Sequence, residues 1–250
     1  MLVLRSAAFN AVFYLNFVLQ MILGLPTVLF GQYAVLRLAC FWGRSSLWLL
    51  ERVCGTRIEI RGVERIPEGG IIVAAKHQSF LDILALLSVF PHTTFVLKRQ
   101  LMRIPLFGLY LSRSGQIGID RSSGRAALTQ AVRGAARAIE DGRQFLIFPE
   151  GTRRPPGAPP AYKYGVAAIY HETGARCVPV ALNSGLFWPR REFLRRSGTV
   201  IVEILEPIGP GLEKAAFLAL LEERIEAASD RLLNEALAHD PNLRRSAGTA

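Results

Sequence analysis

The sequence predicts an α/β fold in which a mostly parallel central sheet is flanked by helices and preceded by a membrane-associated helical hairpin. An uncharged stretch from Ser6 to Leu36 exceeds the roughly 20 apolar residues that a membrane helix needs. From about Thr56, short apolar strands alternate with helical patterns, as in a largely parallel sheet. We therefore expect hydrophobic membrane-anchoring helices over residues 1–50, one α/β domain over residues 51–238 and a flexible tail over residues 239–250.

The composition excludes several classes of protein. Half of the 250 residues are hydrophobic, which is enough for a core and excludes a disordered chain. Cys40, Cys54 and Cys177 are odd in number and widely spaced, which indicates reduced thiols and not a disulfide framework. A net charge of +10 suits an anionic membrane surface. Nucleic acid is not expected as a partner, because no zinc-finger, aromatic RNA-binding or helix-turn-helix pattern is present.

Pro26 interrupts the uncharged N-terminal stretch and predicts one helix up to about Gly24 and a second from about Thr27. A cleaved signal peptide does not fit, because the stretch is too long and Ser6-Ala7-Ala8 lies at the wrong end for cleavage. A single membrane span, a hairpin that enters one leaflet and a buried pair of core helices remain open. The break at Pro26 favours the hairpin, and the arginines that follow predict a cytoplasmic location for the rest of the chain.

The elements of the α/β domain are predicted from the period of the apolar residues. Alternation predicts a half-buried strand at Arg57–Arg61, and continuous apolar runs predict buried strands at Gly70–Ala75 and Gln144–Phe148. Apolar residues at three- and four-residue spacing from Leu128 to Ile139 predict an amphipathic helix that ends at Gly142. The remaining elements are strands at Thr93–Leu97, Gly115–Ile119, Cys177–Leu182 and Thr199–Leu205, and a long helix from Phe217 to Leu233.

His77 is the most informative of the four histidines, because it follows a buried strand and precedes the capping-box pattern Ser79-Phe80-Leu81-Asp82. This pattern predicts a helix that starts at Ser79 and carries Asp82 in its first turn. The Asp82 carboxylate could then hold one ring nitrogen of His77 and leave the other free as a base. The alternative is that Asp82 only caps the helix and His77 is a surface turn residue.

A second group of polar residues follows the strand predicted at Gln144–Phe148. Glu150, Gly151, Thr152 and Arg153 would lie at the carboxyl end of the sheet, where α/β proteins bind ligands. Gly151 permits close approach of a ligand, while Thr152 and Arg153 offer donors to a phosphate. Glu150 would repel phosphate, so we expect it to orient Arg153 or a neighbouring turn. An ordinary polar strand exit is the alternative.

Further cations lie at strand or loop ends: Lys98, Arg121 and Lys163, each of which could also be a solvated surface charge. The segment Trp188–Arg196 interleaves aromatic and basic residues and fits either a headgroup interface or a solvated loop. The motifs of serine hydrolases, zinc proteases, redox dithiols and P-loops are not present in the sequence. No metal site is expected, because the candidate ligands have no second histidine at ligand spacing.

Taken in order, these segments resemble the 1-acyl-sn-glycerol-3-phosphate (lysophosphatidate) acyltransferase family. The family motif H-x-x-x-x-D matches His77 to Asp82, and F-P-E-G-T-R matches Phe148 to Arg153 in full. A motif that closes in an arginine matches Gly115–Arg121, and a proline between apolar residues matches Val178-Pro179-Val180. The family usually has Asn before the histidine, where this chain has Lys76.

The resemblance implies a glycerolipid acyltransferase fold, with His77 as the general base and Asp82 as its orienting partner. The acceptor phosphate site would include Lys98, Arg121, Glu150, Gly151, Thr152 and Arg153, with Lys163 as a further candidate. His77 would take the proton from the sn-2 hydroxyl of 1-acyl-glycerol-3-phosphate as that oxygen attacks an acyl thioester, which gives phosphatidate for phospholipid biosynthesis. The donor would be acyl-CoA or acyl carrier protein, and no metal or redox cofactor is implied.

The same resemblance implies membrane lipids as partners, and an inner-membrane location with the catalytic domain on the cytoplasmic side. Because of Lys76 and the basic segment up to Arg196, another lysolipid, such as a lyso-ornithine lipid, or glycerol 3-phosphate stays open as the acceptor. A non-catalytic lipid-binding protein is disfavoured, since it would not need His77 and Asp82 in this arrangement. A phospholipid hydrolase is a further alternative.

Overall fold

The computed structural model describes residues 1–245, with the side chains of Arg121, Arg244 and Arg245 left out. Its centre is one seven-stranded sheet. The strands are β1 (Thr56–Arg61), β2 (Ile71–Ala75), β3 (Thr93–Lys98), β4 (Ile117–Ile119), β5 (Gln144–Ile147), β6 (Cys177–Leu182) and β7 (Gly198–Ile204). Their spatial order is β1-β7-β6-β2-β5-β3-β4, and all neighbours are parallel except β6 and β7. The predicted mostly parallel sheet is confirmed.

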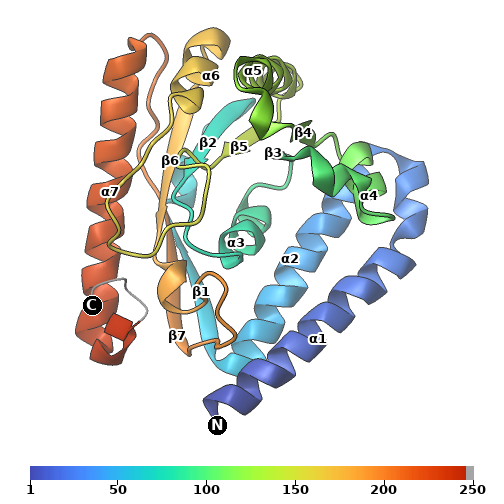
Figure 1. The fold of residues 1–250 in the computed structure, drawn as a ribbon, viewed down its shortest axis with the longest axis vertical. Coiled ribbons are helices and arrows are strands. Elements are labelled where there is room, and N and C mark those ends of the chain that lie inside the picture. The colour runs from blue at the N-terminus through green and yellow to red at the C-terminus, as the bar shows by residue number, and fades with distance from the viewer. Residues whose placement is uncertain (246–250) are drawn as a thin grey trace.

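The α-helices cover both faces of this sheet (Figure 1). They are α1 (Leu2–Leu23), α2 (Gln32–Cys54), α3 (Leu81–Val89), α4 (Phe107–Arg113), α5 (Arg125–Glu140), α6 (Gly165–Thr173) and α7 (Lys214–His239). α5, α6 and α7 lie along one side of the sheet, whereas α2 and α3 lie along the other.

The central strand β2 shows why a continuous apolar run forms here. All five of its residues are buried. Because successive side chains of a strand point to opposite faces, Ile72 packs in the cluster with α5, α6 and α7, whereas Ile71 and Val73 pack in the cluster with α3. Burial on both faces is typical of a parallel sheet covered by helices. The carboxyl ends of β2, β5, β3 and β4 therefore share one edge of the sheet.

The N-terminal hairpin differs in one detail from the sequence prediction. A 3-10 helix at Leu25–Phe30 joins α1 to α2, and α2 begins at Gln32 and not near Thr27. Pro26 lies in the first turn of this 3-10 helix, and Gly31 ends it with a φ of 87°, a left-handed conformation that favours glycine. The second long helix can start only after that turn. The boundary expected at residue 50 falls inside α2, which packs on α3.

One face of α1 belongs to the folded domain. The rings of Phe9 and Phe13 both meet Trp188 edge to face. Ser6 Oγ accepts the Arg195 amide N–H at 2.9 Å, and Asn10 Oδ1 accepts from the Arg195 guanidinium at 3.2 Å. The sequence left open a single membrane span, a membrane hairpin and a pair of core helices, and this face of α1 packs as a core helix does.

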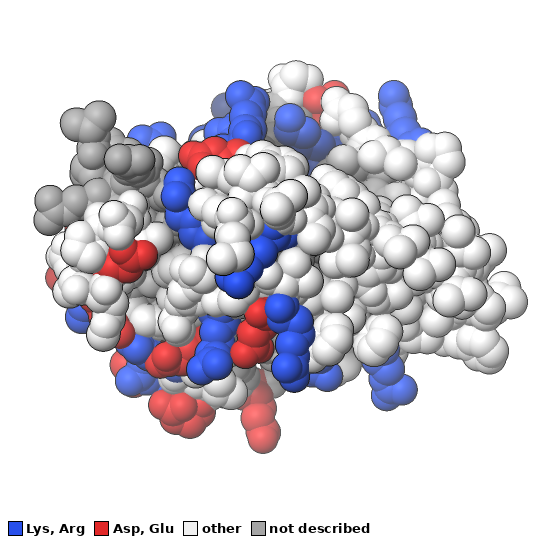
Figure 2. Space-filling view, turned by 90° about the horizontal axis from the view of Figure 1, so that it is seen from below, with Lys and Arg blue, Asp and Glu red and all other residues white. Residues whose placement is uncertain are grey.

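The other face of α1 is exposed and apolar, and within residues 1–245 α1 is the one helix long and apolar enough to cross a membrane. Figure 2 shows that the side of the molecule formed by the N-terminal helices is almost free of charged side chains. Exposed apolar residues on this helix are Leu2, Val3, Leu4, Tyr14, Leu15, Val18, Leu19, Ile22 and Leu23.

The C-terminal tail is more ordered than the sequence suggests. Residues Pro241–Arg245 form a 3-10 helix, and the Leu243 side chain is buried in an apolar cluster with residues of α1 and α2. The burial of this side chain explains why the chain does not fray at His239. Residues 246–250 of the expected tail lie outside the described part of the chain.

Candidate active site

A histidine and a buried aspartate form the centre of the site. His77 lies two residues past β2, and its Nδ1 is 2.9 Å from Oδ2 of Asp82. Asp82 is fully buried, and the same oxygen also accepts the amide N–H groups of Gln78 and Ser79 at 2.8 and 2.9 Å. The Ser184 hydroxyl donates to its other oxygen. Among the described residues His77 Nε2 has no hydrogen-bond partner, so the dyad presents one free ring nitrogen.

The predicted capping box is wrong in its details. α3 begins at Leu81, not at Ser79, and no side chain caps it. Ser79 Oγ instead donates to the Trp188 carbonyl oxygen at 2.6 Å and accepts from the Leu81 amide at 3.1 Å. The Asp82 carboxylate accepts the amides of the loop that precedes the helix. The turn from β2 into α3 is therefore built around the group that holds His77.

The F-P-E-G-T-R motif lies against the dyad. The Phe148 ring stacks on the His77 imidazole, and the Arg154 amide donates to the His77 carbonyl oxygen at 2.8 Å. Gly151 has a φ of 67°, and a Cβ there would be 3.2 Å from Lys163 Nζ. The positive φ favours glycine at this position, and the Lys163 ammonium group lies close to it.

Cations gather at the end of this motif. The Arg190 guanidinium donates to the Arg153 carbonyl oxygen at 3.2 Å and to Thr152 Oγ1 at 3.4 Å. Burial, together with the neighbouring Arg190 charge, lowers the pKa of Arg153. Burial is the larger cause, and a bound anion would compensate the contribution of the Arg190 charge. The arrangement of Thr152, Arg153, Arg190 and Lys163 can bind a phosphate.

Arg190 was not among the predicted site residues. Its only signal in the sequence is the alternation of aromatic and basic residues in Trp188–Arg196, which fitted a headgroup interface or a solvated loop equally well. This segment connects β6 to β7, and its position beside Thr152 depends on the folding of the whole sheet.

Glu150 does not pair with Arg153. It is buried, with its carboxylate 3.3 Å from Lys76 Nζ and 3.5 Å from the Arg154 guanidinium. Burial raises the pKa of Glu150 despite these cations. Of the two roles expected for Glu150, the support of a neighbouring turn is the one observed, because Arg154 belongs to that turn.

The structure places two further predicted cations on the same edge of the sheet as His77. Lys98 ends β3 and is exposed, and its side chain forms no hydrogen bond or ion pair within the described residues. The backbone of Arg121 lies two residues past β4, whose Ile119 pairs with Lys98, but the Arg121 side chain lies outside the described part of the structure. A phosphate role for either residue stays a prediction.

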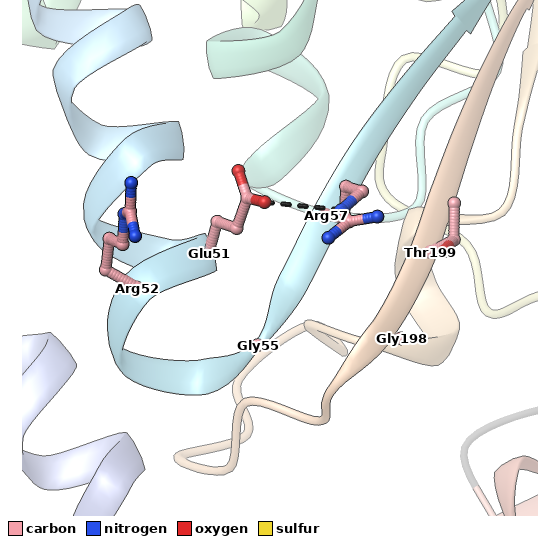
Figure 3. A pocket seen from close by; sticks show the side chains of 6 residues that line it. All are labelled: Glu51, Arg52, Gly55, Arg57, Gly198 and Thr199. Atoms are coloured by element: carbon pink, nitrogen blue, oxygen red, sulfur yellow. Dashed lines mark hydrogen bonds and ion pairs between the residues drawn. The ribbon is translucent and has the colours of Figure 1, made fainter.

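A separate hollow of about 370 Å³ lies where β1 and β7 begin. Figure 3 shows Arg57 turned towards Glu51, with which it forms an ion pair of 3.2 Å, and the start of β7 on the other side. None of the predicted site residues lines this hollow. It is therefore distinct from the dyad and its cations.

Comparisons with known proteins match the chain to acyltransferases. Residues 57–183 match a family described as Acyltransferase. The chain is 36% identical over 186 residues to a 1-acyl-sn-glycerol-3-phosphate acyltransferase of Pseudomonas aeruginosa, covering 74% of this chain and 72% of that protein. It is 30% identical over 174 residues to the protein of the same name from Saccharomyces cerevisiae, covering 68% of this chain and 55% of that protein.

The fold is also similar to a solved structure. The crystal structure of the 1-acyl-sn-glycerophosphate (LPA) acyltransferase of Thermotoga maritima superposes with a TM-score of 0.78 and 24% sequence identity, covering 93% of this chain and 98% of that chain. The fold and the extent of the sequence matches lead to one conclusion: this chain belongs to the 1-acyl-sn-glycerol-3-phosphate acyltransferase family.

Proposed function

We propose that the protein transfers an acyl group from an acyl thioester to the sn-2 hydroxyl of 1-acyl-glycerol-3-phosphate and so forms phosphatidate for phospholipid synthesis. The observation that carries this proposal is the contact of His77 with Asp82 beside the cations at Arg153 and Arg190. A base with one free nitrogen next to a phosphate-binding group is what a phosphorylated alcohol needs as an acyl acceptor. The names of the relatives support the same acceptor.

In this mechanism His77 acts as a general base. Its Nδ1–H donates to Asp82, and Nε2 takes the proton of the acceptor hydroxyl as that oxygen attacks the thioester carbonyl. The tetrahedral intermediate then collapses, the carbon–sulfur bond breaks, and the departing thiolate receives the proton from Nε2. The buried Asp82 carboxylate stabilises the imidazolium that forms between the two steps. Base catalysis of this kind contributes about 10²–10⁴-fold to the rate.

The cations position the acceptor. A phosphate bound by Thr152, Arg153 and Arg190 fixes one end of the glycerol, so that the free hydroxyl is presented to His77. Holding two reactants in this way can lower the barrier by several kcal/mol. Lys163 extends the same positive region, because its Nζ lies close to Gly151.

The exposed face of α1 supports a membrane location. An exposed apolar helix face on a basic protein favours contact with anionic lipids, and the acceptor and product are themselves lipids. We propose that α1 rests on or enters the inner membrane, with the α/β domain on the cytoplasmic side. The thioester donor, acyl-CoA or acyl carrier protein, would then arrive from the cytoplasm.

An acyl-transfer assay tests the proposal directly. The purified protein is incubated with lysophosphatidate in lipid vesicles and a labelled acyl-CoA, and the lipids are separated. We expect labelled phosphatidate, and at least about a hundredfold less of it with His77→Ala. Release of free fatty acid alone would indicate a hydrolase, and product from a lyso-ornithine lipid or glycerol 3-phosphate but not from lysophosphatidate would overturn the proposed acceptor.

A further inference from the structure

A buried cluster of charged side chains lies next to the dyad and involves the C-terminal helix. Lys76 Nζ is 2.7 and 2.8 Å from the two carboxylate oxygens of Glu226 on α7, and 3.3 Å from Oε1 of Glu150. Lys76 and Glu150 are each 2% exposed. The Tyr162 hydroxyl donates to Glu226 at 2.8 Å, which completes the cluster on that side.

Lys76 and Glu150 both belong to chain segments that contact His77. Lys76 directly precedes His77, and its amide donates to the Val180 carbonyl of β6 at 2.9 Å. Glu150 belongs to the motif that carries Phe148 and Arg153. Arg154, which pairs with Glu150, donates its amide to the carbonyl oxygen of His77. A displacement of either carboxylate would therefore move the segments that hold the base and the phosphate.

The charges of the cluster balance only when Glu226 is ionised. Two carboxylates, Glu150 and Glu226, face two cations, Lys76 and Arg154. Glu150 Oε2 is buried and has no hydrogen-bond partner among the described residues, so this carboxylate depends on the neighbouring cations. Removing one partner of a buried ion pair leaves an uncompensated charge, which is strongly unfavourable.

We infer that Glu226 is a positioning residue for acyl transfer, which acts through Lys76 and Glu150 on the backbone around His77. The inference rests on the proposed acyl transfer at His77. Glu226 lies outside residues 57–183, the part of the chain that matches the acyltransferase family, so α7 contributes to the site from beyond that segment.

The charge of Lys76 gives the inference a second consequence. A neutral amide at this position, as in Lys76→Asn, would need no carboxylate partner. Lys76 and Glu226 should therefore behave as a pair, so that the loss of the carboxylate is harmful only while the ammonium group is present. This behaviour distinguishes a coupled pair from two residues that each support the fold separately.

The test is a double-mutant cycle in the full-length protein, with Glu226→Gln, Lys76→Asn and the two combined. The matched control is Glu223→Gln, an exposed carboxylate on the same helix. The values of kcat and KM are measured well below each variant's unfolding temperature, which is followed by circular dichroism. We expect kcat to fall roughly tenfold to a hundredfold in Glu226→Gln. The combined variant should recover most of that loss. In the control, kcat should stay within about twofold of the wild-type value.

Wild-type kcat in a folded Glu226→Gln protein, or no recovery in the combined variant, would overturn the inference. If Glu226→Gln does not fold, Glu226→Asp is the replacement variant, because it keeps the charge. We expect Glu226→Asp to fold, with a loss of kcat smaller than the loss expected for Glu226→Gln. NMR signals of the ¹⁵N-labelled His77 ring give a readout that needs no turnover. They should move in Glu226→Gln and return in the combined variant, so this test still decides the inference if wild-type protein fails to acylate lysophosphatidate.

Discussion

The phenyl ring of Phe148 lies almost parallel to the imidazole of His77, with 3.7 Å between the ring centroids and 13° between the ring planes. One face of the imidazole is thus covered, while its Nδ1 edge is held by Asp82. The ring has little freedom to rotate, and the position of Nε2 is fixed before the acceptor binds. The motif that contains Arg153 therefore also fixes the imidazole of His77.

Replacing Phe148 by Ala should lower kcat by about tenfold, because the imidazole can then rotate away from the attacking hydroxyl. The acceptor KM should change less, since Arg153 and Arg190 remain in place. Phe148→Tyr, which keeps the ring, is the matched control. Steady-state kinetics on both variants would refute this role if Phe148→Ala had the kcat of the wild type.

Replacing His77 by Ala should remove the base and lower kcat by about 10²–10⁴-fold while the fold is retained. Asp82→Asn should also lower kcat, but at a cost in stability, since Asp82 accepts two backbone amides and the Ser184 hydroxyl. Circular dichroism separates the two effects. Full acyl transfer by folded His77→Ala would exclude the dyad mechanism.

Arg153→Ala and Arg190→Ala should each raise the acceptor KM by roughly tenfold, equivalent to about 1.4 kcal/mol of binding free energy. The KM of the acyl thioester should stay nearly constant, because we propose that these guanidinium groups bind only the acceptor phosphate. The control is Arg133→Ala, which removes an exposed arginine on α5. Equal changes in both KM values would argue against a phosphate-binding role.

Introducing charged residues on the exposed face of α1 should weaken membrane binding without unfolding the protein. Leu15 and Leu19 are 57% and 46% exposed, so the double change to Asp costs little core packing but places charge in the proposed lipid contact. Vesicle sedimentation should show at least a severalfold loss of binding. Val63→Asp, at a 51% exposed apolar residue in the segment between β1 and β2, is the control. Undiminished sedimentation would place the membrane contact on another surface.

The three cysteines should resist thiol reagents in the folded protein. All three are buried, and burial raises the pKa of Cys40, Cys54 and Cys177 above the ordinary thiol value. A raised pKa leaves a smaller share of each thiol as the reactive thiolate than in a free cysteine at the same pH. Ellman's reagent should detect no thiol in native protein at pH 8 and all three in urea. Fast native labelling would contradict this expectation.

Local patterns predicted most of the fold, because burial leaves a direct mark on short segments. The run Ile71–Ala75 is apolar at every position because both of its faces are covered, and β6 was predicted with its observed bounds, Cys177–Leu182. The start of α2 was misplaced, because the sequence does not show whether Pro26 opens an α-helix or a 3-10 turn. The 3-10 helix at Pro241–Arg245, which buries Leu243, was missed, since a single buried leucine shows no period in the sequence.

The site was predictable only where its residues are close in sequence. The spacing from His77 to Asp82 is short enough to place the two side chains together, and the structure does so. The contacts of Ser184 with Asp82 and of Glu226 with Lys76 join residues 102 and 150 positions apart, and no local pattern reports them. From the sequence alone, Lys76 can be interpreted as a sign of a different acceptor. In the structure its ammonium group pairs with Glu226 on α7.

The contacts of Arg195 with Ser6 and Asn10 have a practical consequence for purification. Trimming the first helix to improve solubility would expose Trp188 and would remove two hydrogen-bond acceptors from Arg195, a residue largely shielded from water. Its backbone amide would lose Ser6 Oγ, and its guanidinium would lose Asn10 Oδ1. The truncated protein would aggregate, and the loop at Trp188, which contacts Ser79, would lose its support. The resulting loss of activity could then be misinterpreted as a requirement for lipid. Detergent or nanodiscs with the intact polypeptide are the better route to a homogeneous sample.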